Sequence, residues 1–464
     1  MNSHPDFVSP PPGCPAHDAH NAGEHDAQDA QEAEAPVPLY GPEFAASPAS
    51  YYDYLRQFGP AAPVELSPGV SAMLVTDYTA ALHVLQNPER YSKDARRWRD
   101  FAEGRVAEDS SVVPMLGYRP NCLFTDGAEH MRLRQAVTDS LARVDSHRLS
   151  RHIERVSGYL VGQFAHRGSV DLLNDYAKML PLLVFNEIFG CPPEIGDRLI
   201  YGTSGIFDAD VDAENANKEL TQALVELVAL KRAQPGEDIT SWLMQHSAKL
   251  TDEEMIHQLV MLIAAGTEPQ RNLIANGLRL VLSDERFSGG RYGGSLLVED
   301  ALDEVLWDAP PMANYAPHYP VQDTELFGVP LEAGELVLIS FAAANTDPAL
   351  PSSRHTLSKR AHLGWSAGPH ACPAKDPAQL IAVVAIEKLL NQLPDIELAV
   401  PVDSLVWRPG PFHRALASLP ARFTPVRLPP KPALPSSSSA SQAAPQAGPE
   451  KGTWWSSFLT WWRV

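Results

Sequence analysis

One cysteine of this 464-residue chain, Cys372, stands in a short glycine-containing stretch just ahead of a long apolar helical pattern. Gly364 and Gly368 permit a tight loop with backbone angles that other residues avoid. The N–H groups and the dipole at the start of the following helix favour a thiolate over a thiol at Cys372. A thiolate in such a loop can serve as a nucleophile, a zinc ligand or a haem ligand.

The residues around Cys372 argue against some of these roles for its thiolate. No set of Cys and His residues lies nearby for zinc, and the four cysteines are far apart with no C-x-x-C pair. His370 is the candidate base for a nucleophile, but residues two apart in an extended loop point to opposite sides. The residue types therefore favour a metal ligand or a structural cysteine, and they do not rank these two.

Long helical patterns dominate the part of the chain that must position this loop. Thr251 and Glu254 form a capping box that opens an apolar-periodic run to about residue 282. Similar starts predict helices over 126–141 and over 376–390. Segments with a strand-like sequence are short and lie mostly toward the C-terminus, at 324–327, 336–340 and 418–423. The sequence predicts one mainly α domain with small β-sheets.

Composition divides the chain into four segments. Residues 1–38 predict a disordered acidic tail, 39–427 a single large folded domain, and 428–452 a Pro/Ser/Ala-rich linker. The last segment, 453–464, has tryptophans at helical spacing and predicts an amphipathic helix that docks to a membrane interface, to a partner or to its own domain.

Net charge and hydropathy argue against a nucleic-acid-binding protein and against a membrane-spanning one. The formal net charge is −20, which argues against nucleic acid as a partner. No apolar run approaches the length of a membrane span, and no signal peptide pattern begins the chain. We therefore expect a cytoplasmic protein.

The loop around Cys372 resembles the cysteine loop of cytochromes P450. In both, an aromatic residue (Trp365), a glycine three residues on (Gly368) and a basic residue (His370) precede the cysteine. The resemblance implies that Cys372 binds the iron of haem b, that His370 contacts a haem propionate and that Trp365 shields the sulfur. It also implies the P450 fold for the whole domain.

Other segments resemble the same family in the same order. The stretch 125–137 is similar to the helix whose His and Arg bind propionates, here His130 and Arg134, one helical turn apart on one face. His318 stands where the family often has a third propionate-binding Arg. Residues 323–337 and the turn at 344–348 are similar to the family's late sheet.

The stretch 264–272 resembles the family's oxygen-binding helix, which implies that Ala265, Gly266 and Glu268 line the oxygen side. The residue after the acid is usually Thr, but here it is Pro269, which has no side-chain donor and no N–H. Glu268 with a bound water is then the candidate proton relay. The alternative is that Glu268 is a solvated helix residue and Pro269 merely fixes a kink.

The family's Glu-x-x-Arg motif reads Glu304 to Trp307 in this chain, as in a bacterial subgroup of the family. Without the arginine, Glu304 must be exposed, be protonated or find another cation. The candidate cations lie just before the cysteine loop: Arg354, His355, Lys359 and Arg360.

The resemblance implies a haem monooxygenase that oxidises an apolar small molecule with O₂ and with electrons from ferredoxin and ferredoxin reductase. The departures at Pro269 and Trp307 favour an alternative. In that alternative the chain is an atypical haem-thiolate protein that uses peroxide, senses a ligand or serves as a non-catalytic partner subunit.

Overall fold

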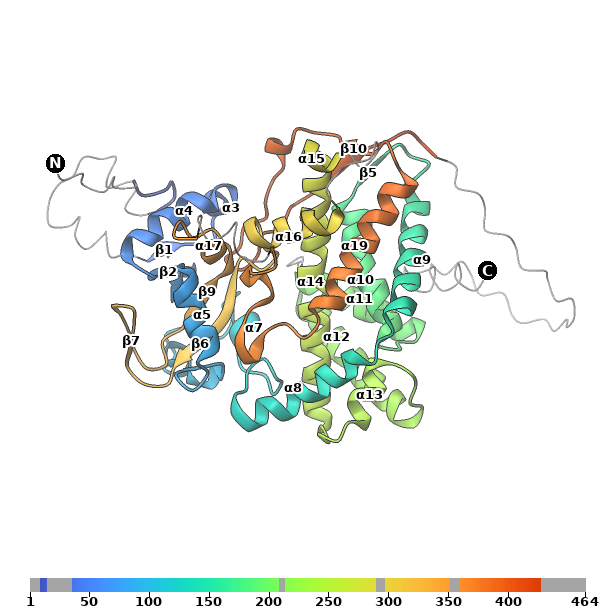
Figure 1. Cartoon of the computed structure of the whole chain (residues 1–464). Coiled ribbons are helices and arrows are strands. Elements are labelled where there is room, and N and C mark those ends of the chain that lie inside the picture. The colour runs from blue at the N-terminus through green and yellow to red at the C-terminus, as the bar shows by residue number, and fades with distance from the viewer. Residues whose placement is uncertain (1–8, 15–35, 208–212, 289–296, 351–358, 427–464) are drawn as a thin grey trace, which may run out of the picture.

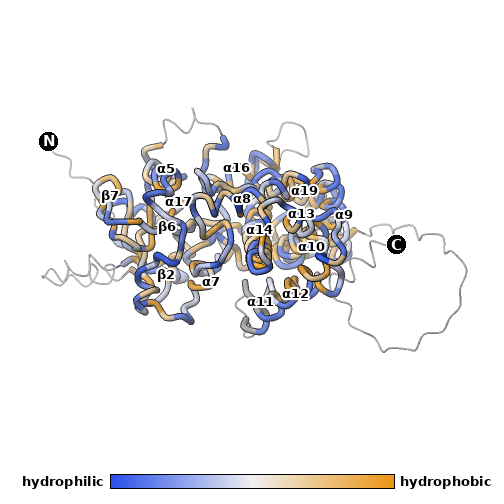
Figure 2. Tube along the Cα trace, turned by 90° about the horizontal axis from the view of Figure 1, so that it is seen from below, coloured by the Kyte–Doolittle hydropathy of each residue, from blue (hydrophilic) through white to orange (hydrophobic). Residues whose placement is uncertain are grey.

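A computed structural model describes residues 9–14, 36–207, 213–288, 297–350 and 359–426. In Figure 1 a helical part occupies the right of the molecule and a smaller sheet-containing part the left. The long helix α14 (Asp252–Ser283) crosses the helical part and packs against α10 (Met179–Ile188), α16 (Val298–Asp308) and α19 (Lys375–Gln392). In Figure 2 the helices around α14 alternate between hydrophobic and hydrophilic stretches, as amphipathic helices do. The predicted mainly α domain is confirmed.

The remaining helices are short or lie around this core. They are α3 (Pro42–Ala46), α4 (Pro48–Leu55), α5 (Tyr78–Gln86), α6 (Arg99–Ala102), α7 (Val113–Leu116), α8 (Gly127–Ala142), α9 (Ser146–Phe164), α11 (Pro193–Phe207), α12 (Ala213–Ala233), α13 (Ile239–Gln245), α15 (Glu285–Ser288) and α17 (Phe341–Asn345).

The central helix α14 starts as predicted. The Glu254 N–H donates to Thr251 Oγ1 at 3.2 Å, and the Thr251 N–H donates back to Glu254 Oε2 at 2.8 Å. Pro269 lies inside the helix without ending it. Because proline has no N–H, the carbonyl of Ala265, four residues earlier, has no intrahelical donor.

Within the described residues, three small sheets complete the fold. A six-stranded sheet has the order β1 (Val37–Pro38), β2 (Ala61–Ser67), β3 (Val70–Val75), β9 (Val337–Ser340), β6 (Asn314–Pro320) and β4 (Tyr91–Ser92). A three-stranded sheet has the order β10 (Glu397–Leu398), β11 (Pro420–Arg422) and β5 (Ser169–Asp171), and β7 (Thr324–Leu326) pairs with β8 (Val329–Leu331).

The predicted late strands are confirmed as β7, β9 and β11. The expectation that strands sit mostly late is wrong, because the long antiparallel pair β2–β3 comes early in the domain. Prolines and alanines make this stretch, 61–75, resemble a loop in sequence, although more than half of its side chains are buried.

Two parts of the predicted acidic tail belong to the packed structure. Cys14 is buried and the Tyr51 hydroxyl donates to the carbonyl of Pro12, while Val37 and Pro38 form β1 on the edge of the large sheet. The linker and the Trp-rich segment, 428–464, lie outside the described residues. None of the helices in the described ranges is both long enough and apolar enough to cross a membrane.

Candidate functional site

The cysteine loop is folded into two 3₁₀ turns, Leu363–Trp365 and Gly368–His370, ahead of α19. The Cys372 N–H donates to the carbonyl of Trp365 at 2.8 Å, which closes the loop. Gly368 has φ +68°, and a Cβ there would lie 2.1 Å from the carbonyl oxygen of Leu85. Glycine is therefore required, because the loop packs directly on the backbone of α5.

The thiol of Cys372 is partly buried at the start of α19. Burial raises its pKa, and the hydrogen bond from the Ala374 N–H acts in the opposite direction with a smaller effect. The N–H groups at the helix start therefore act in the direction that we expected, but burial outweighs them. A thiolate at this position needs an additional positive charge, such as a metal ion, close to the sulfur.

His370 does not serve Cys372 as a base. It lies in a 3₁₀ turn rather than in the extended loop that we expected, and its ring packs on that of His130 with centroids 4.0 Å apart. Its Nε2 is 3.5 Å from Asp126 Oδ1. The nucleophile interpretation of Cys372 is not supported by this arrangement.

His130 and Arg134 share one face of α8, beside the cysteine loop. Arg134 Nη2 donates to the carbonyl of Ala371, which ties α8 to the loop. His130 Nε2 is buried and has no hydrogen-bond partner in the described part of the chain. Burial, followed by the nearby charges of His370 and Arg134, lowers the pKa of His130 to about 4.

Asp126, at the start of α8, has a different role from the predicted cap. Its carboxylate accepts hydrogen bonds from Ser92 Oγ at 2.6 Å and from the Lys93 N–H at 2.8 Å, and it caps no N–H of α8. The prediction of a capping box at this helix is wrong because donors from β4 and its loop, together with His370, surround the carboxylate instead.

His318 joins this group from the sheet. It lies in β6 next to a register shift, is 3% exposed, and its Nδ1–H donates to the carbonyl of Ala316 at 2.7 Å. Burial, followed by the charge of Lys93, lowers the pKa of His318 well below its usual range. Its charge is therefore set by burial, and not by a nearby carboxylate.

The donors that surround the cysteine loop are rich in nitrogen and poor in anions. A buried His130 nitrogen without a partner needs an acceptor, because an unsatisfied buried donor costs about 1–3 kcal/mol. A haem group with two carboxylates beside a cysteine ligand fits this donor set. The structure brings together five of the seven residues that we predicted to bind the cofactor, namely His130, Arg134, His318, His370 and Cys372.

The two small residues predicted for the oxygen side, Ala265 and Gly266, lie in different surroundings. Ala265 is exposed, although it lies at the middle of the central helix α14. Gly266 faces α10, where a Cβ would come within 2.7 Å of the Phe185 ring, so close helix packing requires glycine there. Ala265 is thus the residue of this pair that is open to a ligand.

Glu268 is held in a buried ion pair. Its carboxylate accepts from Arg271 Nη1 and Asn272 Nδ2, each at 3.3 Å, and from Arg408 Nη2. Its side chain is 7% exposed, so the alternative of a solvated helix residue is wrong. Thr267 is no substitute for the missing threonine, because its hydroxyl donates to the carbonyl of Ile263.

Glu304 forms an ion pair with a cation that was not among our candidates. Arg286 of α15 lies 2.6 Å from Glu304 Oε1, and the pair is partly exposed. Of the candidates, Lys359 pairs with Asp300, and Arg360 lies 3.6 Å from a carboxylate oxygen of Asp303. Arg354 and His355 lie outside the described residues.

Trp307 replaces the motif's arginine with a different contact. Its indole N–H donates to the carbonyl of Lys359 at 2.6 Å, and its ring meets that of His362 edge to face at 5.8 Å. The tryptophan therefore anchors the chain just before the cysteine loop, as the arginine would do through charge.

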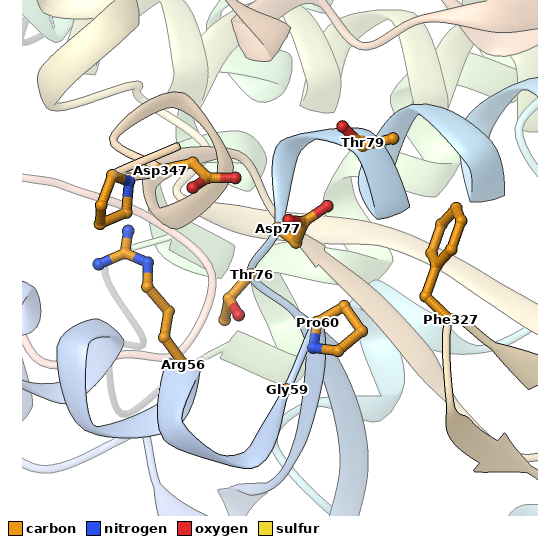
Figure 3. A pocket seen from close by; sticks show the side chains of 9 residues that line it. Arg56, Gly59, Pro60, Thr76, Asp77, Thr79, Phe327 and Asp347 are labelled. Atoms are coloured by element: carbon orange, nitrogen blue, oxygen red, sulfur yellow. The ribbon is translucent and has the colours of Figure 1, made fainter. Parts of the chain in front are cut away.

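A surface cleft of about 510 Å³ lies away from these residues, between α4, the start of α5 and the β7–β8 hairpin (Figure 3). Three of its charged side chains already have structural partners. Asp77 Oδ1 accepts from the Ala80 N–H, Asp347 Oδ2 from the Tyr78 N–H, and Arg56 Nη2 donates to the carbonyl of Ala343. No predicted site residue lines this cleft.

Comparison with known proteins agrees with this geometry. The chain is 31% identical over 395 residues to cytochrome P450 monooxygenase PikC of Streptomyces venezuelae, a match that covers 82% of this chain and 92% of PikC. The chain belongs to the cytochrome P450 family. Like the other members of this family, the P450 uses haem iron as its cofactor. No family model matches the chain.

Other relatives and solved structures extend over the same part of this P450. The polyketide biosynthesis cytochrome P450 PksS of Bacillus subtilis is 27% identical, over 83% of this chain and 98% of its own length. The structure of CYP154C4 from Streptomyces sp. W2061 superimposes with a TM-score of 0.74 at 27% identity, covering 83% of this chain and 97% of that one. The P450 fold is therefore established for the domain.

Sequence reasoning missed two residues of the site region. Arg408, which pairs with Glu268, lies 140 residues away in a loop with no recognisable pattern. Lys93 follows β4 and is almost completely buried, although lysine is normally a surface residue. Neither residue stands in a motif, so only their positions in the fold indicate a role.

Proposed function

We propose that this P450 is a haem-thiolate monooxygenase in which Cys372 Sγ binds the iron. The observation that carries the proposal is the buried, partnerless His130 nitrogen among donors that converge beside the cysteine loop. His130, His318 and His370 would hold the propionates. Arg134 would position the loop through the Ala371 carbonyl while reaching the same carboxylates.

When bound, haem supplies the oxygen chemistry, and the residues of this chain bind, orient and supply protons. Trp365 in the cysteine loop would exclude water from the sulfur. The Ala265 carbonyl, freed by Pro269, is an acceptor on the exposed side of α14 and would hold a water or a substrate hydroxyl. Glu268 would pass protons to that water after releasing one of its arginines.

The substrate that we propose is an apolar small molecule, with electrons from ferredoxin and ferredoxin reductase. Relatives carry names such as vitamin D(3) 25-hydroxylase, from Pseudonocardia autotrophica, which is 29% identical over 83% of this chain. An apolar substrate also suits the hydrophobic clusters around α14, to which α10 and α13 contribute.

The test of this proposal is the spectrum of the reduced protein with carbon monoxide. We expect the wild-type protein to show the long-wavelength band that marks a thiolate-bound haem. Cys372→Ser should lose that band, while Cys191→Ser, which replaces a buried cysteine beside Lys231 and Asp238, should retain it. A wild-type protein that shows no haem absorption would refute the proposal.

A second candidate function is favoured by the ion pairs of Glu268. Because Arg271 and Arg408 both hold the carboxylate, and Pro269 removes the usual hydroxyl, proton delivery has no ready donor. A haem-thiolate protein that uses peroxide needs no such delivery to oxygen. Product formation with hydrogen peroxide but not with O₂, ferredoxin, ferredoxin reductase and reductant would favour this candidate over the first.

The Trp-rich segment 453–464 remains a proposed docking element. Its tryptophans at helical spacing support binding to a membrane interface or a partner groove. Deletion of residues 453–464 should abolish flotation with phosphatidylcholine vesicles if the segment binds a membrane. Flotation that the deletion does not change would rule out membrane docking.

A further inference from the structure

Lys93 is buried in a way that lysines seldom are. It lies between β4 and the next 3₁₀ turn, where its backbone N–H donates to Asp126 at 2.8 Å. The residue is 1% exposed and is among the largest fully buried side chains. Its long side chain therefore lies inside the protein.

The ammonium of Lys93 has no partner in the described part of the chain. No oxygen accepts a hydrogen bond from it, and no carboxylate oxygen lies within the 4.0 Å of an ion pair. Asp126 is close enough to favour the charge, but its Oδ2 accepts from Ser92 and from the Lys93 backbone, and its Oδ1 lies 3.5 Å from His370 Nε2. Burial accordingly lowers the pKa of Lys93 to about 7.

The neighbours of Lys93 indicate which anion is missing. Its charge acts on His130, His318 and His370, so it lies within electrostatic range of all three. These histidines come from α8, β6 and the cysteine loop, and Lys93 adds a fourth segment, the loop after β4. An ammonium inside a protein without an anion beside it is destabilising, and a carboxylate among these groups would remove that cost.

We propose that Lys93 is a further propionate-binding residue, whose ammonium forms an ion pair with one haem carboxylate. This inference rests on the proposed haem site, and it adds a residue that none of the family-like motifs contains. A structural role for Lys93 as the partner of Asp126 does not fit, because no ion pair joins the two side chains.

The test uses the haem-loaded protein and measures the rate of haem transfer to excess apomyoglobin. Lys93→Met keeps the length and apolar stem of the side chain but removes the charge. We expect this variant to lose haem roughly ten- to a hundredfold faster than wild type, as for loss of a charged hydrogen bond. Lys93→Arg should stay near wild type. Lys388→Met is the matched control, because Lys388 lies on α19 with its ammonium 3.8 Å from Glu154 at the surface.

A second cofactor separates contact with the propionate from general loosening. In protohaem dimethyl ester both propionates are uncharged, so wild type and Lys93→Met should release it at similar rates. Equal acceleration with both cofactors, or no acceleration with haem, would overturn the role of Lys93. A wild-type protein that never binds haem would instead refute the proposed function, so the two failures are distinguishable.

Discussion

Some charged residues inside this domain are stabilised by partners from distant parts of the chain. Glu268 shows this, because its carboxylate is shared by Arg271 on the same helix and Arg408 from the C-terminal loop. The pair of Glu304 and Arg286 differs from it in burial, because both of its side chains are partly exposed. The two glutamates therefore differ in how much stability their loss removes.

Glu268→Ala should lower the free energy of unfolding by about 3–5 kcal/mol, because it leaves two arginines without their buried anion. Glu304→Ala is the matched control, and we expect a loss below about 1 kcal/mol for a partly exposed pair. Urea unfolding followed by tryptophan fluorescence measures both. Equal losses would contradict the assignment of Glu268 to a buried pair.

A single buried histidine, His362, makes the free energy of unfolding depend on pH. Burial lowers its pKa from 6.5 to about 4, and neither ring nitrogen has a partner in the described structure. The unfolded chain therefore takes up the proton first as the pH falls. The contribution to stability is complete above pH 6.5 and is lost as the pH falls toward 4, by about 1.4 kcal/mol per pH unit.

His362→Phe should flatten the fall in unfolding free energy over this range, as measured by urea unfolding at a series of pH values. His166→Phe removes an exposed histidine after α9 and serves as the control. If both variants keep the full wild-type slope, His362 is not the group that titrates.

At the scale of the element, α14 shows that proline can sit inside a long helix when tertiary packing fixes both halves. The helix runs unbroken from Asp252 to Ser283 because α10, α16 and α19 pack along it. The local cost of Pro269 falls on one hydrogen bond, that of the Ala265 carbonyl. That carbonyl lies beside the exposed face of α14 that we propose to face oxygen and substrate.

Pro269→Ala should restore the missing hydrogen bond and raise the free energy of unfolding by about 1–3 kcal/mol. Pro377→Ala is the matched control, since Pro377 lies in the first turn of α19, where an N–H has no helical partner. The urea midpoint measures the difference. A Pro269→Ala variant no more stable than Pro377→Ala would show that α14 is not strained at this position.

At the scale of the whole molecule, the site forms where the helical and sheet-containing parts meet. Asp126 connects them, because it starts α8 and binds the loop after β4 while His370 of the cysteine loop lies beside it. The donors around Cys372 hold their positions only while these segments stay together.

Asp126→Ala should therefore increase amide hydrogen exchange at residues 91–94 and in the cysteine loop together. Asp145→Ala removes an ordinary cap from α9, where Asp145 accepts from the Arg148 N–H. It should weaken that cap and leave exchange near Cys372 unchanged. Exchange that rises only near residues 91–94 would show that Asp126 does not support the cysteine loop.

The sequence by itself determined the local features of this P450. The capping box at Thr251 and the turn at Gly368 follow from short-range rules, because hydrogen bonds and backbone angles within a few residues decide them. The order of family-like motifs likewise predicted roles for Cys372, His130 and Arg134. Only the tertiary structure decided which charges meet: Arg408 with Glu268, Arg286 with Glu304, and Asp126 with the loop after β4. These partners are far apart in sequence or follow no periodic pattern, and burial, which sets their energies, is a property of the folded chain.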